Sequence, residues 1–292
     1  MKAREAVTAG LAENIDRMLA VEPDVRADAE DSVHQMRVAT RRLRSLLRSY
    51  RKLFRKSEAA ELNAELKWLA GLLGVARDAE VRAERFAALP AGDRGDEASA
   101  AVVNRLAEAQ RAAYAQAHTA VLEALDSDRC AALRETVERW RTDPPVRGKR
   151  GRESAEKVFR AVLEGDTERL RTRIRTEHEL AEHDHTADER LEALHDIRKA
   201  AKRLRYSAEA AVGVLGDHAD ELRAQAKRVQ SVLGDHRDAI EAARVILASA
   251  TESEGTGTHP DTDIYVRLAA AEEASGEQEL TRYPEAARAF TE

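Results

Sequence analysis

The chain has 292 residues, a net charge of −6 and 43% apolar residues, which is enough to build two compact helical subdomains with cores of their own. Glycine (14), proline (6) and aromatic residues (4%) are scarce, whereas Ala, Leu, Glu and Arg dominate. This composition favours helices over β architectures. The longest apolar run, Trp68 to Ala76, is about half as long as a membrane span. We therefore expect an all-α protein that does not contact a membrane.

Two features concern the cellular compartment. The N-terminal segment carries acidic residues and lacks the apolar stretch of a secretion signal. The single cysteine, Cys130, excludes an intramolecular disulfide and fits a reducing environment. We expect a cytoplasmic protein.

Helical periodicity runs through almost the whole chain, and no segment alternates as a strand does. In chain order, helices are predicted over residues 3–21, 31–55, 58–88, 97–140 (broken near Asp126), 153–182, 187–215, 219–250 and 262–280. The polar, Gly- or Pro-containing segments 89–97, 142–152 and 250–263 predict loops. The middle loop predicts a boundary between an N-terminal half, residues 1–141, and a C-terminal half, residues 153–292. Asp31 or Ser32 is expected to cap the helix that follows.

The two halves share a pair of motifs. His34-Gln-Met-Arg37-Val-Ala-Thr-Arg41-Arg42-Leu-Arg44 is matched 161 residues later by His195-Asp-Ile-Arg198-Lys199-Ala-Ala-Lys202-Arg203-Leu-Arg205. Leu73-Gly74-Val-Ala-Arg77-Asp78 is matched 160 residues later by Leu233-Gly234-Asp-His-Arg237-Asp238. Two motif pairs at nearly one offset indicate a duplicated helical unit. We expect approximate internal two-fold symmetry.

The first motif places cations along one helix face. At about 100° per residue, Arg37, Arg41, Arg44, Arg48, Lys52 and Arg55 fall on the side of His34. Between His34 and Ser57 the chain has nine Lys or Arg and no Asp or Glu. In the second copy His195, Arg198, Lys202 and Arg205 share a face.

Such a stripe of like charges repels itself by a few tenths of a kcal/mol per pair, so it calls for a counter-charge. Arginine offers paired donors to phosphate oxygens, and a flexible linear polyphosphate could follow the row. The alternative is that the stripe forms salt bridges to acidic helices of the same protein. In the second motif, Lys67, Gly74 and Arg77, like Lys227, Gly234 and Arg237, share a helix face. Each glycine marks either a close helix approach or a helix end, and each Arg-Asp pair either contacts ligand or ties helices together.

Other chemistry has weaker support. His178, Glu182 and His185 share a helical face, but the HExxH spacing is absent and a polar helix end is the favoured interpretation. The chain lacks a phosphate-binding P-loop, and Gly255-Thr-Gly257 is an isolated pair of glycines. The basic helices lack interleaved aromatic residues for base stacking. We expect no enzyme activity, no cofactor, no metal and no specific nucleic-acid partner.

At these motifs the sequence resembles the CHAD family, and the resemblance extends from about residue 3 to about residue 285. It implies one CHAD-like domain over residues 1–292, built as two four-helix bundles that are related by internal pseudo-two-fold symmetry. It also implies that this domain binds inorganic polyphosphate on a central basic surface. The binding residues implied or expected from the stripe are His34, Arg37, Arg41, Arg42, Arg44, Arg48, Lys67, Arg77, His195, Arg198, Lys199, Lys202, Arg203, Arg205, Tyr206, Lys227 and Arg237. The second copy departs from the first, because it lacks the basic extension from Arg48 to Lys56 and has Glu209 instead. CHAD domains are often fused to a triphosphatase domain with a Glu-x-Glu-x-Lys element. We find no such element in this sequence and expect a stand-alone copy. Association with polyphosphate granules is a further expectation.

The role of His34 and His195 is open at this stage. They can bond phosphate oxygens, accept a phosphoryl group, bind a metal or bond a neighbouring helix. The alternative function is therefore a phosphohistidine or metal-binding regulatory module. If the histidines contact polyphosphate, its affinity is expected to rise as pH falls from 8 to 6, because a bound polyanion favours protonated histidine.

Overall fold

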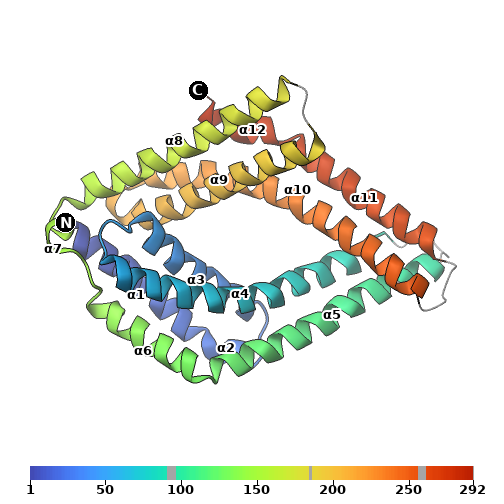
Figure 1. Ribbon diagram of the computed structural model, residues 1–292, viewed down its shortest axis with the longest axis horizontal. Helices are drawn as coiled ribbons and strands as arrows, with labels where there is room; N and C mark the ends of the chain where they lie inside the picture. Colours follow the sequence, from blue (N-terminus) through green and yellow to red (C-terminus); the bar gives the residue numbers. More distant parts are fainter. Residues whose placement is uncertain (91–96, 184–185, 256–260, 292) are drawn as a thin grey trace. The chain divides into compact units, whose positions relative to one another are not determined.

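The computed structural model describes residues 1–90, 97–183, 186–255 and 261–291, and within these ranges all regular elements are helices (Figure 1). The prediction of an all-α fold is confirmed. The elements are α1 (Ala3–Ala20), α2 (Glu22–Arg26), α3 (Ser32–Ser49), α4 (Lys56–Ala87), α5 (Glu97–Leu125), α6 (Asp128–Thr142), α7 (Gly148–Gly151), α8 (Ala155–Ala181), α9 (Ala187–Leu215), α10 (Asp217–Gly255), α11 (Thr262–Leu280), α12 (Tyr283–Ala287) and the 3₁₀ turn η1 (Arg288–Phe290). No described helix is long and apolar enough to span a membrane.

The predicted helices match these elements closely, including the break near Asp126. There Ser127 caps α6, because its hydroxyl accepts the Cys130 N–H at 3.2 Å. Asp31 is the N-cap of α3, as expected, but its side chain makes no capping hydrogen bond and its φ of 59° is left-handed.

The prediction of a helix over residues 31–55 is wrong at its C-terminal end. α3 ends at Ser49, and the chain then turns so that Leu53 and Phe54 are buried. The Phe54 ring lies 5.8 Å from the Trp140 ring, and the Arg55 N–H donates to the Pro145 carbonyl at 2.9 Å. Burial of two large side chains outweighs continuation of the helix. Lys52 therefore lies in an exposed turn and not on the basic helix face.

The described chain forms two compact units, and each takes segments from both halves of the sequence. Unit 1 comprises Met1–Gly74, Ala120–Gln230 and Ala286–Glu292; unit 2 comprises Val75–Thr119 and Ser231–Glu285. The changes from unit 1 to unit 2 fall at or next to the two Leu-Gly-x-x-Arg-Asp motifs. The division into N- and C-terminal bundles, and their two-fold symmetry, stay predictions.

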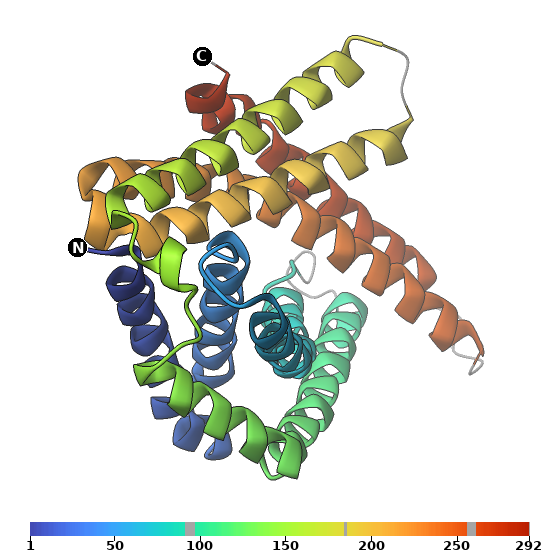
Figure 2. The ribbon, with the colours of Figure 1, turned by 60° about the vertical axis from the view of Figure 1, so that its left-hand side comes forward.

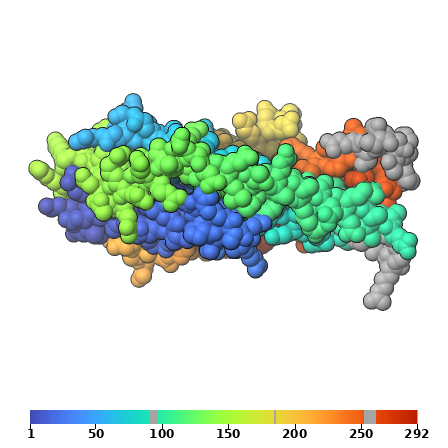
Figure 3. Space-filling view, turned by 90° about the horizontal axis from the view of Figure 1, so that it is seen from below, coloured from blue at the N-terminus to red at the C-terminus, as the bar shows by residue number. Residues whose placement is uncertain are grey.

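In unit 1 the two helices that carry the His-Arg motifs pack together. α8 and α9 run side by side in both ribbon views, and α9 also contacts α3 (Figures 1 and 2). α1 packs against α3 and α6, and Figure 3 shows α1 in blue beside α6 in green. The apolar sides of α3 and α9 thus form the core, which leaves their polar sides available for another role.

Tyr50 links the end of α3 to α8 and α9. Its ring centroid lies 4.3 Å from that of Phe159, and its hydroxyl donates to the Ser207 carbonyl at 3.0 Å. Tyr50, Phe159 and Ser207 are all buried. Burial raises the pKa of Tyr50 well above its ordinary value, so the hydroxyl stays a donor at physiological pH.

Unit 2 has its own core between parts of α4, α5, α10 and α11. Phe86, Val102, Ile246 and Leu268 are among its fully buried members. The buried carboxylate of Glu272 accepts from Arg85 at 2.7 Å. α10 and α11 run side by side in Figures 1 and 2.

We expect Tyr50→Phe to lower the free energy of unfolding by about 1 kcal/mol, because it leaves the buried Ser207 carbonyl without this donor while the ring packing is kept. Urea unfolding followed by circular dichroism measures this. Thr119→Val is the control, since it removes an exposed hydroxyl bonded within its own helix, and its effect should stay within about 0.5 kcal/mol. Equal stability of Tyr50→Phe and the wild type would contradict the assigned link.

Candidate functional site

The polar side of α3 carries a row of arginines. Arg37, Arg41, Arg44 and Arg48 follow one another at helical spacings of four, three and four residues, so they share a face. Met36, Leu43 and Leu47 are buried on the opposite face. Burial of this apolar face holds the helix in a fixed rotation, and the arginines must point away from the core.

α9 presents a second row by the same logic. Arg198, Lys202 and Arg205 share one face, while Ile197, Leu204 and Ala208 are fully buried. α3 packs against α9 within unit 1, and the two rows come together at Tyr206, because Arg41 of α3 and Arg205 of α9 lie 5.9 and 5.0 Å from its ring centroid. We call this set the basic surface, which consists of Arg37, Arg41, Arg44, Arg48, Arg198, Lys202 and Arg205.

Four arginines of the basic surface act on Lys202. Its pKa is lowered from the ordinary 10.5 to about 7, first by burial and then by Arg41, Arg198, Arg37 and Arg48, in that order. The pKa of Arg41 is lowered as well, mainly by burial and further by Arg37, Arg198 and Arg205. Cations from two helices therefore act on one another at short range.

Four members of the basic surface form no ion pair within the described chain, although the Asp166 charge opposes the lowering of the Arg48 pKa that burial causes. Among the described residues, no carboxylate forms an ion pair with Arg41, Arg44, Arg48 or Lys202. The Nε atom of Arg44 is buried and has no hydrogen-bond partner within the described chain. A buried unbonded donor costs about 1–3 kcal/mol, which an anionic ligand can recover.

Other predicted site residues are neutralised by the protein itself. Arg42 forms an ion pair with Glu209, and Arg203 donates to Asp166 at 2.6 Å, with Asp166 only 3% exposed. Lys199 pairs with Asp196 at 2.6 Å. The alternative of internal salt bridges thus holds for these three cations, which lie on the same helices as the basic surface.

Tyr206 supports two of the arginines. The guanidinium carbons of Arg41 and Arg205 lie 5.9 and 5.0 Å from its ring centroid, within cation–π range. Arg205 also donates to Gln230 of α10 at 3.2 Å. Because Tyr206 is 6% exposed, it orients guanidinium groups and offers little surface to a ligand.

Gly74 and Gly234 lie inside α4 and α10, so the alternative that each glycine ends a helix is wrong. A Cβ atom on Gly74 would lie 3.8 Å from Nη2 of Arg37. The glycine therefore marks a close approach of α4 to the Arg37 side chain, which connects the second motif to the first.

The remaining cations of the second motif are spread out. Lys67 and Lys227 are exposed in unit 1, whereas Arg77 and Arg237 belong to unit 2. Arg77 pairs with Glu80 at 2.8 Å. Their predicted part in ligand binding stays a prediction.

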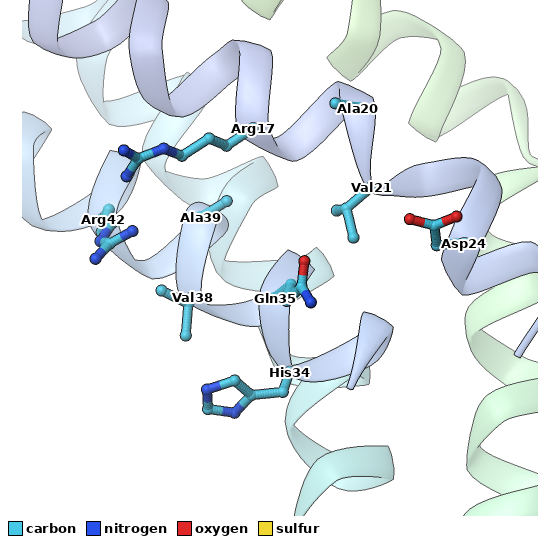
Figure 4. A pocket seen from close by; sticks show the side chains of 9 residues that line it. All are labelled: Arg17, Ala20, Val21, Asp24, His34, Gln35, Val38, Ala39 and Arg42. Carbon is cyan, nitrogen blue, oxygen red and sulfur yellow. The ribbon is translucent and has the colours of Figure 1, made fainter. Parts of the chain in front are cut away.

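His34 lines a pocket of about 410 Å³ between α1, α2 and α3 (Figure 4). Arg17 and Arg42 reach toward one end of this pocket, away from the His34 ring. Both arginines are paired, Arg17 with Glu13 at 2.6 Å and Arg42 with Glu209. The pocket is therefore far less cationic than the basic surface.

The roles predicted for His34 and His195 stay predictions. His195 lies beside Asp196, whose pKa is lowered by Lys199 first and by His195 last. Within the described ranges, no three His, Cys, Asp or Glu side chains are grouped as metal ligands. His185 and Gly257, considered above for metal and phosphate binding, lie outside the described residues. α8 ends at Ala181, before Glu182.

Two acids that shape the site were not predicted as partners. Asp166 lies on the same face of α8 as the buried residues Phe159, Leu163, Leu170 and Ile174. An acid at helical spacing among apolar residues indicates a buried carboxylate that needs a partner. Glu209 was noticeable as a departure between the two motif copies. Neither feature of the sequence predicts which arginine pairs with the acid.

Lys202→Met should stabilise the free protein. Because folding lowers the pKa of Lys202, the unfolded chain binds more protons than the folded chain between about pH 7 and 10.5, and wild-type stability rises with pH in that window. Below pH 7 the full penalty of the buried charge is present. We expect Lys202→Met to raise the free energy of unfolding at pH 6 by about 1–3 kcal/mol and to remove this part of the pH dependence.

Urea unfolding at pH 6, 7.5 and 9 measures this effect. Lys199→Met is the matched control, since Lys199 is exposed and paired with Asp196, and it should not be stabilising. A Lys202→Met protein that is less stable than the wild type at pH 6 would show that Lys202 is compensated in the free protein.

Comparison with known proteins places this geometry in a family. A family model described as CHAD domain matches residues 9–247. Two uncharacterized proteins of Mycobacterium tuberculosis, from strains CDC 1551 / Oshkosh and ATCC 25618 / H37Rv, are each 36% identical over 236 residues, which is 74% of this chain. The chain spans 43% of the length of these relatives.

Solved structures show the same fold. PptA from Streptomyces chartreusis matches with a TM-score of 0.78 at 19% identity, over 99% of this chain and 100% of its own. The CHAD domain from the plant Ricinus communis matches with a TM-score of 0.69 at 25% identity, over 99% of this chain and 92% of its own. With a family model that spans most of its length, the chain belongs to the CHAD domain family.

Proposed function

We propose that this protein binds inorganic polyphosphate on the basic surface and does not turn it over. The observation that carries the proposal is the meeting of two cationic rows in which Arg41, Arg44, Arg48 and Lys202 have no carboxylate partner among the described residues. The family is known in general for binding polyphosphate. A polyanion laid across the surface supplies the missing counter-charge.

The chemistry of the surface suits a chain of phosphates. Neighbouring side chains on one helix face are about 5–6 Å apart, so consecutive cations can meet successive parts of a linear ligand. Six of the seven members are arginines, whose planar guanidinium groups donate pairs of hydrogen bonds to phosphate oxygens.

The aromatic residues near the surface favour polyphosphate over single-stranded nucleic acid. Binding of single strands uses aromatic side chains on which bases stack. Tyr50, Phe54 and Tyr206 lie near the basic rows, and all three are buried. A ligand made of phosphates alone loses nothing from this, whereas bases would lack a stacking platform here. Cytoplasmic location and association with polyphosphate granules belong to the same proposal.

Charge reversal on α3 tests the site. Arg37→Glu with Arg41→Glu should weaken binding of long-chain polyphosphate at least about a hundredfold, because each change removes a charge-assisted bond of about 1.5–3 kcal/mol and adds repulsion. The matched control is Arg139→Glu with Arg171→Glu, which makes the same change of net charge at exposed positions of α6 and α8. Polarisation of fluorescently labelled polyphosphate measures the affinity. If both double variants weaken binding alike, the basic surface is not the site.

The affinity should also depend steeply on salt. By analogy with single-stranded nucleic acids, where the slope is about −0.7 per contacted phosphate, we expect the logarithm of the association constant to fall with the logarithm of the salt concentration with a slope steeper than about −3. Titrations between 50 and 300 mM KCl, roughly the range over which such electrostatic binding is lost, measure this slope. Unlabelled polyphosphate should displace single-stranded DNA, and single-stranded DNA at equal phosphate concentration should not displace polyphosphate. The reverse order would favour a nucleic-acid ligand.

A further inference from the structure

The basic surface contains one lysine, Lys202, among arginines that two helices bring together, since Arg41 of α3 and Arg205 of α9 both lie over the Tyr206 ring. Arg37, Arg41 and Arg48 face Lys202 from α3, and Arg198 faces it from its own helix α9. Lys202 is half-buried, so water screens these charges less than at an exposed site.

Three acids near the basic surface are each paired with another cation of the described chain. From α8, Asp166 is held by Arg203 at 2.6 Å. On α9, Asp196 is held by Lys199 at 2.6 Å, and Glu209 is held by Arg42. From α10, the neutral amide of Gln230 accepts from Arg205 at 3.2 Å. Within the described chain Lys202 has no ion pair with an acid, and the charged groups that act most strongly on it are arginines.

We propose that binding of polyphosphate is coupled to the uptake of one proton by Lys202, so that the site holds the chain more tightly as pH falls. This inference rests on the proposed function and deepens it by naming what regulates the site. Lys202 is the member of the basic surface that can respond in this way, because the guanidinium group of arginine stays charged at any physiological pH.

The coupling follows from linkage between two equilibria. In the free protein, burial and four arginines keep the pKa of Lys202 at about 7, so its side chain is largely a neutral amine at pH 8. A phosphate chain places negative oxygens beside the amine, and these favour the ammonium form. The amine takes a proton from the buffer, its nitrogen lone pair forms the new N–H bond, and the cation donates to phosphate oxygen. Since the bound state holds one more proton, lower pH must strengthen binding.

The size of the effect follows from the same values. If bound ligand restores the ordinary pKa, the affinity falls about fivefold between pH 7 and 8 and about tenfold between pH 8 and 9. Histidine, with an ordinary pKa of about 6.5, would place its dependence mainly below pH 7. The pH range therefore separates Lys202 from His34 and His195.

Calorimetry measures the proton directly. Long-chain polyphosphate is titrated into the full chain at pH 8.5 in two buffers of different ionisation enthalpy, and the difference between the two heats gives the number of protons taken up. Long chains are needed because their terminal phosphates, which titrate near neutral pH with the opposite effect on binding, are few. We expect uptake of close to one proton by the wild type and by the double variant His34→Gln, His195→Gln.

Lys202→Arg is the decisive variant, because it keeps the positive charge and removes the titration. It should take up almost no proton and bind at least about tenfold more tightly than the wild type at pH 8.5. At pH 6 the two proteins should bind alike within about threefold, since Lys202 is charged in both states there. A second measurement on the wild type avoids any packing change: the Lys202 side-chain amine, followed by NMR, should titrate near pH 7 when free and above pH 9 when polyphosphate is bound.

The outcomes separate this inference from the proposed function. Polyphosphate binding by the wild type with no proton uptake, or equal uptake by wild type and Lys202→Arg, would overturn the coupling and leave the function standing. Loss of uptake in the double histidine variant would overturn it in favour of the histidines. Absence of polyphosphate binding by the wild type at every pH between 6 and 9 would overturn both.

Discussion

The rest of this structure depends on one constraint, which is the repulsion among the cations that the packing of α3 and α9 brings together. Burial of Leu43 and Leu47 on α3 and of Ile197 and Leu204 on α9 sets the rotation of both helices. The row from Arg37 to Arg48 and the row from Arg198 to Arg205 come together at the Tyr206 ring, which lies 5.9 Å from Arg41 and 5.0 Å from Arg205, despite the electrostatic cost. Each pair costs a few tenths of a kcal/mol on a solvated helix and more where water is excluded. The hydrophobic core can sustain this cost because fully burying one large apolar side chain contributes about 1.5–3 kcal/mol.

The same two helices divide their cations between two tasks. Arg42 and Arg203 form ion pairs with Glu209 and Asp166, and loss of Arg203 would be strongly destabilising because it would leave the buried Asp166 carboxylate without its partner. Arg41, Arg44 and Arg48, one to six residues from Arg42 on α3, form no ion pair with a carboxylate within the described chain. About two turns of α3 therefore hold one arginine that the protein neutralises and three that it does not. A proposal for the site that treated all basic residues of the motif alike would miss this division.

Local pattern predicted most of the fold, and long-range contacts explain what it missed. Helix positions followed from the 3.6-residue period, and the break before α6 from Asp126 and the polar residues around it. The end of α3 was wrong because Phe54 is buried against Trp140, a contact across many residues of chain that periodicity does not contain. The same holds for the site: the rows were visible in the sequence, but Arg42 pairs with a residue 167 positions away and Arg203 with one 37 positions away. The compact units likewise combine segments from both sequence halves.

The net charge of −6 and the basic surface are compatible because charge acts locally. At physiological salt the screening length is about 8 Å, so a phosphate chain responds to the cations that it contacts and not to the sum over the protein. Under the proposed function, the acidic remainder would repel a polyanion from other faces and confine it to the basic rows. Protonation of Lys202 would then change the local charge by one unit at the place where the ligand binds. The total charge of the protein would have little influence, because screening confines each charge to its surroundings. One half-buried amine would thereby control binding, since it lies among the arginines that the ligand contacts.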